Sequence, residues 1–280
     1  MKTKCIIGLS LLVSAITGCQ ESTLHNNGAK GPSNNELKLS GDSTVYGLAC
    51  EGCSDSIIVL LPNDGSDPVR YNIIDATRNQ KVLGDINTGD WIGLVLNKKD
   101  MSVADMAIDL DQLKGIWCYT VMPKWRDANS QHREQQNQMT REMSDSLKRK
   151  LFVPREYGFW LKRQWEASSV GHVQESNSPF DENPVVYPPL AYFVKWHIWN
   201  GKFVLVSGNP QYGKDNKVEG YSDIRYDTCS IDYLGKDSLV LTNRKGSRSY
   251  YRKSDINEVN KKIKTVTNVK TKQTPQKKAE

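Results

Sequence analysis

The chain has 280 residues, of which 38% are apolar and 25% are charged, and its formal net charge is +6. Residues 1–18 contribute +2 and residues 254–280 contribute +4, so the segment between them carries no net charge. A neutral body argues against a protein that binds nucleic acid through a basic folded surface. The length suggests two modest domains.

The first residues predict an export signal. Lys2 and Lys4 precede an apolar run from Cys5 to Ile16. This run is shorter than the roughly 20 residues that cross a bilayer, and it fits the apolar core of a signal peptide. We therefore expect an exported protein.

The apolar run ends in Ile16-Thr17-Gly18-Cys19, which resembles the lipobox of bacterial lipoproteins. The resemblance implies that residues 1–18 are removed and that the Cys19 sulfur and the new amino group are acylated. Several acyl chains on one residue make a lasting anchor. We expect the lipid on Cys19 to hold the chain in the cell envelope, at the outer membrane. The alternative is an ordinary secretory signal in which Cys19 is incidental.

Two polar segments flank the body. Residues 19–38 are rich in Asn, Gly and Ser, which predicts a flexible tether. Residues 254–280 hold seven Lys and no aromatic residue, which predicts a basic disordered tail. Contact between this tail and anionic lipid or a surface polymer is the alternative.

Four cysteines remain besides Cys5 and the anchor: Cys50, Cys53, Cys118 and Cys229. The Cys50-Glu51-Gly52-Cys53 motif is followed by no His and lies in no strand-to-helix context, which argues against a haem or thioredoxin-type site. A zinc site needs a second pair of ligands, and the other two cysteines have no Cys or His nearby. We expect a local disulfide between Cys50 and Cys53, or inert thiols, with no metal and no cofactor.

Residues 39–112 alternate short strands with turns. Apolar runs at 44–49, 56–61, 69–74, 91–96 and 104–110 predict strands, and Asn63-Asp64-Gly65 predicts a turn. Five or six short strands in so few residues predict a small β domain, either a barrel of the OB type or a strongly bent sheet.

A different pattern begins at residue 113. Gly115-Ile116-Trp117 precedes a strand, and residues 127–150 lack Gly and Pro, which predicts one inserted helix. Met139, Met143 and Leu147 are spaced four apart and would share one face of that helix. We expect this stripe to lie on the barrel; contact with a ligand is the alternative.

The rest of residues 113–253 predicts an all-β domain. Asn200-Gly201 between two strand-like runs is a strong hairpin signal. Counting from Ile116, the pattern gives about eight antiparallel strands, the number that closes a barrel around its own side chains or one small ligand.

Three segments carry a resemblance to a known family: 195–205, 237–241 and 250–253. They resemble the lipocalin-like lipoproteins of Bacteroides-type bacteria, over about residues 113–253. The matching motifs are structural, and the resemblance implies a fold without implying catalytic residues. The chain departs from simple members by its N-terminal β domain and its inserted helix.

No catalytic motif is present in the sequence. The residues His25, His132, His172 and His197 are scattered, and HExxH, GxSxG, P-loop and GxGxxG patterns are missing. The acidic pairs Asp109/Asp111 and Asp181/Glu182 fit solvated carboxylates. We expect no catalytic residue and no enzyme. His197 is expected to face outward, opposite Trp196 and Ile198; a polar group inside the barrel is the alternative.

Aromatic residues are the remaining candidates for a binding site. Core packing is the default expectation for these residues, and the alternative is an apolar ligand pocket lined by Trp117, Trp160, Trp196 and Tyr192. Trp196 and Trp199 are three apart, so on a regular strand they face opposite sides.

The first functional hypothesis is a membrane-anchored envelope lipoprotein whose barrel binds a small apolar ligand. The alternative is a non-catalytic scaffold or assembly subunit that binds a partner envelope protein. An enzyme with a site shared between the domains is a third hypothesis. A cavity in the barrel favours the first hypothesis, and an interior filled by side chains favours the second.

Overall fold

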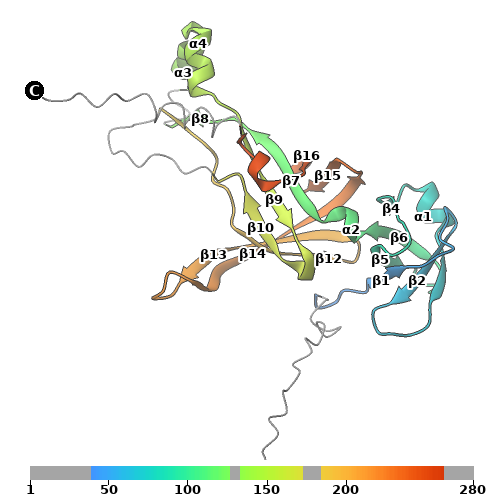
Figure 1. Cartoon of the computed structure of the whole chain (residues 1–280). Coiled ribbons are helices and arrows are strands. Elements are labelled where there is room, and N and C mark those ends of the chain that lie inside the picture. The colour runs from blue at the N-terminus through green and yellow to red at the C-terminus, as the bar shows by residue number, and fades with distance from the viewer. Residues whose placement is uncertain (1–38, 127–132, 173–183, 262–280) are drawn as a thin grey trace, which may run out of the picture.

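The computed structural model describes residues 39–126, 133–172 and 184–261. It contains a six-stranded sheet, an eight-stranded sheet and a two-stranded ribbon. Figure 1 shows the two larger sheets side by side, with the short helix α2 (Leu110–Leu113) where the chain passes from one to the other. The predicted signal and tether, residues 1–38, lie outside the described residues with Cys19 and His25, and so do His132, Asp181 and Glu182. Within the described ranges, no helix is long and apolar enough to cross a membrane.

The six-stranded sheet is built from the N-terminal third of the chain. Its elements are β1 (Val45–Ala49), β2 (Ile57–Pro62), β3 (Val69–Asn72), α1 (Ile74–Arg78), β4 (Val82–Leu83), β5 (Trp91–Leu96) and β6 (Ala104–Asp109). The strand order is β3-β2-β1-β5-β6-β4, and only the β4–β6 pair in this order is parallel.

The edge strand β3 also meets the segment that leads into β6. Asn72 at the end of β3 forms a parallel bridge with Val103, and its backbone N–H donates to the Ser102 carbonyl at 2.9 Å. The five longer strands therefore form a ring in the order β1-β2-β3-β6-β5. In the chain, α1 follows β3. This is the connectivity of an OB-type Greek-key barrel, one of the two arrangements expected from the sequence.

The core of this unit follows from strand alternation. Ile58 and Leu60 on β2 and Ile92 and Leu94 on β5 are at most 1% exposed. They pack with Ala104 and Ala107, whose small side chains let β6 approach closely. Full burial of such aliphatic side chains contributes about 1.5–3 kcal/mol each.

The eight-stranded sheet is antiparallel throughout. Its strands are β7 (Gly115–Val121), β9 (Arg155–Leu161), β10 (Ala167–Val170), β12 (Phe193–Trp199), β13 (Lys202–Tyr212), β14 (Val218–Leu234), β15 (Ser238–Asn243) and β16 (Gly246–Lys253), in the order β10-β9-β7-β16-β15-β14-β13-β12. The ribbon pairs β8 (Lys124–Trp125) with β11 (Val185–Val186). Single-turn helices η1 (Arg163–Trp165) and η2 (Ile256–Glu258) complete the described chain.

The edges of this sheet, β10 and β12, come together. Glu166 and Lys195 form an antiparallel bridge between them. The Ser169 hydroxyl donates to the Ala191 carbonyl at 2.5 Å and accepts from the Phe193 N–H at 2.7 Å. The sheet is therefore a nearly closed barrel of eight strands, which confirms the predicted lipocalin-like architecture.

Aromatic side chains fill the described interior of the barrel. Trp117, Trp196, Phe159 and Phe203 are each at most 2% exposed. The Phe159 ring centroid lies 5.9 Å from that of Phe203 and 5.1 Å from that of Tyr250. These spacings are those of direct ring contact.

The Gly-x-Trp motif forms one closed end of the barrel. The Arg252 guanidinium lies 4.1 Å from the Trp117 ring centroid and donates to the Lys114 and Gln112 carbonyls. Gly115 has φ 128°, and a Cβ there would collide with this guanidinium. Glycine at this position leaves room for the cation that covers Trp117.

The predicted helix over 127–150 is wrong as one element. The described part contains α3 (Arg133–Glu142) and α4 (Asp145–Leu151), because the Ser144 hydroxyl caps α4 by accepting from the Leu147 N–H at 3.4 Å. Figure 1 shows both helices standing beyond the ends of β7 and β9.

The expected packing of the helical stripe on the barrel is also wrong. Met139 is 55% exposed and Leu147 is 44% exposed. The break at Ser144 removes the continuous face, and the helices attach instead through Trp125. Its indole N–H donates to the Thr140 hydroxyl at 3.0 Å, and its ring centroid lies 5.4 Å from that of Phe152.

The ordered body extends past the predicted start of the tail at 254. Val259 is 2% exposed and Asn260 is 4% exposed, and η2 precedes them. Residues 254–261 therefore pack on the barrel, and the rest of the predicted tail lies outside the described residues.

The Asn200-Gly201 turn between β12 and β13 confirms the predicted hairpin and joins the two units. Both residues have positive φ, 49° and 75°, as the tight turn requires. The Asn200 side-chain oxygen accepts from the Ser43 N–H at 2.9 Å, and the Asn200 N–H donates to Asp42 Oδ1 at 2.9 Å. Tyr46 of β1 donates to the Ile198 carbonyl at 3.0 Å.

Candidate functional site

A cleft of about 390 Å³ lies where the two units meet. The six-stranded unit and α2 contribute Leu48, Asn63, Gly89, Trp91 and Asp111, and the barrel side contributes Lys114, Arg163 and Gln164. Ligand sites favour boundaries between structural units, where concave surface can form without opening a core. We call this hollow the interunit cleft.

Trp91 is the aromatic wall of the interunit cleft. It starts β5, directly after the Gly89-Asp90 turn, and it is partly buried. Its ring centroid lies 4.8 Å from that of Trp165, which lies 4.7 Å from that of Trp196. Trp91 is thus the cleft-facing member of an aromatic column that continues into the barrel core.

Asp111 and Lys114 form a neutral pair at the cleft. The Asp111 carboxylate accepts from the Trp91 N–H at 2.7 Å and forms an ion pair with the Lys114 ammonium. That ammonium also lies 5.6 Å from the Trp91 ring centroid. The pair therefore orients Trp91 and leaves little net charge on this wall.

Arg163 and Gln164 form the opposite rim, on the η1 turn between β9 and β10. Gln164 and Trp165 have φ values of 56° and 61°, a left-handed conformation that bulky residues rarely adopt. Trp165 is 3% exposed, so its burial between Trp91 and Trp196 holds the turn in this conformation. Among the described residues, the Arg163 guanidinium has no hydrogen-bond or ion-pair partner.

His197 lies next to Trp165 of this column. Its predicted strand face is right, but its predicted exposure to solvent is wrong. It is on the strand face opposite Trp196, but it is 8% exposed and its ring centroid lies 5.4 Å from that of Trp165. Burial, with Lys195 adding to it, lowers the pKa of His197 to about 4, against an opposing effect of Asp42. Its Nδ1 and the Trp165 Nε1 are buried without a partner among the described residues.

Asp109 also differs from the expected solvated carboxylate. It is 2% exposed, and it caps α2 by accepting from the Gln112 N–H at 2.8 Å. Burial raises the pKa of Asp109 to about 6, the Gln112 bond opposes that rise, and Asp90 and Asp111 add to it. Its role in the structure is therefore that of a helix cap.

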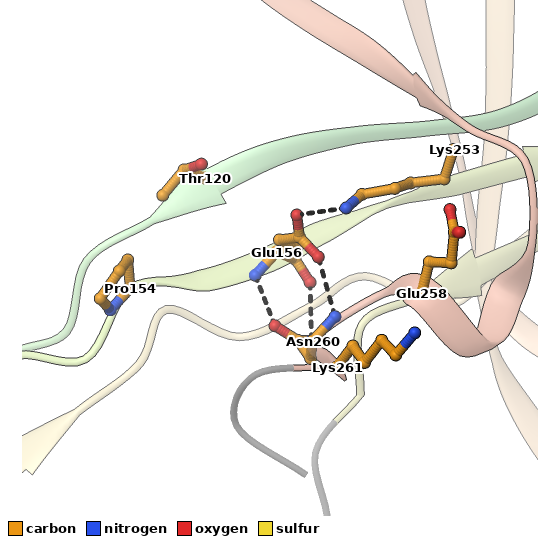
Figure 2. Close-up of a pocket in the computed structure, with 7 residues that line it drawn as sticks. All are labelled: Thr120, Pro154, Glu156, Lys253, Glu258, Asn260 and Lys261. Carbon is orange, nitrogen blue, oxygen red and sulfur yellow. Dashed lines mark hydrogen bonds and ion pairs between the residues drawn. The ribbon is translucent and has the colours of Figure 1, made fainter. Parts of the chain in front are cut away.

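A second hollow, of about 510 Å³, lies against the outside of the barrel beneath the C-terminal segment (Figure 2). Glu156 is at its centre and accepts from Lys253 and from the Tyr251 hydroxyl, each at 2.8 Å. Asn260 donates its backbone N–H to the Glu156 carboxylate at 2.8 Å, and its side-chain oxygen accepts from the Glu156 N–H at 2.7 Å.

The pKa of Glu156 reflects this pairing. Burial raises it, but the bonds from Lys253, Asn260 and Tyr251 outweigh burial and hold the pKa below its ordinary value. Glu156 and its partners bind one another, so these contacts fasten residues 254–261 to the barrel. We call this set of contacts the C-terminal latch.

A third hollow, of about 320 Å³, lies beside the β13–β14 hairpin. Tyr192 lines it together with Asn209, Asp223 and Arg225. The Tyr192 ring centroid lies 6.0 Å from that of Tyr221.

The structure does not bring the four predicted ligand residues together. Trp117 and Trp196 are fully buried, and their indole N–H groups donate to the Leu113 and Lys162 carbonyls. Trp160 is 37% exposed on the outside, and Tyr192 is 43% exposed at the third hollow. Trp199 is also 37% exposed, which confirms that it faces away from Trp196.

Sequence reasoning missed Trp91 and Arg163. The Gly89-Asp90 turn directly before Trp91 was a usable signal, since it places an aromatic ring at the end of a strand. Arg163 carried no such signal, because its position depends on the left-handed turn that follows it.

All four described cysteines are free thiols. The Cys53 thiol donates to the Cys50 carbonyl at 3.2 Å, which is the local geometry of a reduced pair. Burial, with a smaller contribution of Glu156, raises the pKa of Cys118 to about 12. Within the described ranges, no group of three or more His, Cys, Asp or Glu could hold a metal ion.

Comparisons with known proteins give one structural match. No family model matches the chain, and no curated protein matches it. Among solved structures, a lipocalin-like protein from Bacteroides thetaiotaomicron is similar over 50% of this chain and 95% of its own, at 16% identity and a TM-score of 0.25. The class therefore rests on strand order and closure, which define an all-β protein with a lipocalin-like barrel and a separate smaller sheet.

Proposed function

We propose that this chain is a non-catalytic binding protein of the bacterial envelope, held at the outer membrane by the lipid on Cys19. The pattern Ile16-Thr17-Gly18-Cys19 supports the anchor, and the polar segment 19–38 would separate the folded body from the bilayer. The lipocalin-like barrel supports a role in binding a small molecule.

The interunit cleft is the proposed binding site. The sequence predicted a small apolar ligand inside the barrel, but aromatic side chains fill the described interior. The observation that carries the proposal is Trp91, which lines an open hollow together with Arg163, a cation without a partner in the described part of the chain. An aromatic wall with a few convergent polar groups is the usual composition of a small-molecule site.

The anchor is tested with Cys19→Ser in the native host. The variant should leave the membrane fraction and take up no labelled palmitate, while the matched variant Cys5→Ser should behave as wild type because Cys5 lies within the removed segment. Membrane retention of Cys19→Ser with unchanged labelling would contradict the anchor.

The binding site is tested by native mass spectrometry of the Cys19→Ser full chain purified from its own host. A co-purifying small molecule should be present, and it should be lost in the additional variant Trp91→Ala. The matched variant Trp160→Ala, at an exposed indole outside the cleft, should retain it. A bound molecule that survives Trp91→Ala would place the ligand elsewhere.

The scaffold alternative has two supporting observations. Aromatic side chains fill the described interior of the barrel, which favours a scaffold over a barrel that holds a ligand. The α3–α4 pair extends beyond the barrel and exposes Met139 and Leu147, as a surface for an envelope partner would. Under this alternative, Met139→Lys with Leu147→Lys should abolish in-cell crosslinks to that partner without changing the melting temperature. Unchanged crosslinks would exclude these helices as the partner surface.

A further inference from the structure

The charge of the interunit cleft is unbalanced at one residue. Asp111 and Lys114 neutralise each other, and the remaining lining residues other than Arg163 are uncharged. Asp90, next to Trp91, does not line the cleft, and its carboxylate accepts from the Asn87 N–H at 2.6 Å. Among the described lining residues, the Arg163 guanidinium is therefore the one charge without an opposite charge beside it, which suits a ligand with one negative charge.

The planar shape of the Arg163 guanidinium indicates which kind of anion the cleft would bind. A guanidinium presents paired N–H donors in one plane, which match the two oxygens of a carboxylate. The left-handed backbone at Gln164 and Trp165 fixes the turn that carries Arg163, and Trp165 is buried against Trp91. Because the backbone of the turn is already fixed, only the exposed side chain of Arg163 has to be ordered when a ligand binds.

Two planar amides are also available in the cleft. Asn63 and Gln164 are exposed lining residues, and among the described residues their side-chain amides have no partner. Each amide offers donors and an acceptor, so it can form hydrogen bonds with hydroxyl groups, which both donate and accept. The ligand should therefore carry hydroxyls in addition to its carboxylate.

The apolar part of the cleft matches the body of such a ligand. Trp91 and the 42% exposed Leu48 form an apolar wall opposite the polar rim. The C–H face of a saccharide ring packs on the electron-rich face of an indole, while its hydroxyls point outward to polar groups. A volume of about 390 Å³ is at the small end of the range for ligand pockets, which suits one or two rings.

From these features we propose that the interunit cleft binds an acidic sugar, a saccharide ring with a carboxylate. Arg163 holds the carboxylate, Asn63 and Gln164 read the hydroxyls, and Trp91 supports the ring. The assignment rests on the proposed function and adds the chemical class of its ligand.

The test titrates the Cys19→Ser full chain by calorimetry with three probes: glucuronate, glucose and benzoate. Glucuronate should bind at least tenfold more tightly than the other two, because glucose lacks the carboxylate and benzoate lacks the hydroxyls. Its affinity should fall as salt is raised, since the contact to Arg163 is exposed.

Variants separate the parts of the site. Arg163→Gln should reduce glucuronate affinity at least tenfold and leave glucose affinity unchanged, and Asn63→Ala should weaken both sugars and not benzoate. Arg244→Gln removes an exposed cation in the β15–β16 turn and should change none of the affinities.

The outcomes distinguish this inference from the proposed function. Equal binding of glucuronate and glucose, or no effect of Arg163→Gln, overturns the acidic ligand while a Trp91-dependent site stands. Benzoate binding as tightly as glucuronate overturns the sugar. If no probe binds but Trp91→Ala still removes a co-purifying molecule of another class, the inference fails and the function stands. If Trp91→Ala changes no binding of any kind, both fail.

Discussion

Arg252 shows how one side chain can close a barrel end. Its guanidinium covers the Trp117 ring and donates to main-chain carbonyls, including that of Lys236 at 2.6 Å. Burial lowers its pKa, while Asp237 and Asp109 oppose that change. The Gly-x-Trp motif therefore acts together with Arg252, which lies far along the chain and packs on the Trp117 ring.

Replacement of Arg252 should be costly. Arg252→Ala leaves carbonyl oxygens without a donor and uncovers Trp117, so we expect the free energy of unfolding to fall by about 3 kcal/mol. Arg252→Lys should restore only part of it, because an ammonium cannot reach several carbonyls in one plane. Urea unfolding measures both. Arg248→Ala, which removes an arginine 4.2 Å from the Tyr119 ring, is the control and should cost less than 1 kcal/mol. Equal costs at the two positions would contradict this account.

His197 makes stability depend on pH in a defined window. Its pKa is about 4 in the folded chain and near 6.5 when unfolded. Between these values the unfolded chain binds more protons, so the stability that His197 contributes is complete above pH 6.5 and is lost as the pH falls toward 4. We expect a loss of about 1–2 kcal/mol across this window.

The measurement compares the pH dependence of stability in wild type and His197→Phe. The variant should lose less stability between pH 6.5 and 4, and His197→Gln serves if the ring substitution prevents folding. Asp109→Asn should change the slope in the opposite direction, because the raised pKa of Asp109 favours folding as the pH falls through about 6. Parallel curves for His197→Phe and wild type would refute the prediction.

At the scale of elements, the C-terminal latch depends on Asn260. Its side chain also donates to the Glu156 carbonyl at 3.0 Å (Figure 2). It donates as well to the Gly171 carbonyl at 3.1 Å, and its φ of 57° is left-handed. Asn260→Gly keeps that backbone accessible and removes only the side-chain bonds. We expect hydrogen-exchange protection at residues 255–261 to fall at least tenfold, while that of the other strands is unchanged.

The control for the latch is Asn257→Gly, at an exposed position in η2 whose side chain has no partner among the described residues. It should leave protection at Val259 near the wild-type value. If both variants release the segment equally, the apolar contact of Val259 holds it rather than Asn260.

Elements with local causes could be predicted from the sequence. Strand alternation gave both β units, and Asn200-Gly201 gave its hairpin, because the periodicity and the turn chemistry are local. The helix was predicted too long because the Ser144 cap interrupts a segment free of Gly and Pro. The site could not be predicted, since Trp91 and Arg163 lie on different units and meet only after both have folded.

At the scale of the whole molecule, the two units share one core. Tyr46, Leu83 and Ile108 of the six-stranded unit belong to the same buried cluster as Trp117 and Trp196 of the barrel. The β12–β13 turn adds polar contacts beside this cluster. Units that share buried surface of this kind should unfold together.

Gly201 tests that coupling. A Cβ at Gly201 would lie 2.6 Å from Met106 Sδ and 3.1 Å from Val95 Cγ2, both on the six-stranded unit, whereas one at Gly65 would meet nothing within 4 Å. Both glycines lie in turns between paired strands and have similar positive φ, 75° and 81°, so Gly201→Ala and Gly65→Ala carry similar backbone strain. Only Gly201→Ala should also push the units apart.

Calorimetry distinguishes the two variants. Wild type and Gly65→Ala should each unfold in a single transition, with the latter about 1 kcal/mol less stable. Gly201→Ala should unfold in two transitions, or lose at least twice as much stability as Gly65→Ala. Its interunit cleft should also bind ligand more weakly, because Trp91 and Arg163 are held together only by the docked units. Equal behaviour of the two variants would show that the shared core alone fixes the units, and that the Asn200-Gly201 turn serves only its own hairpin.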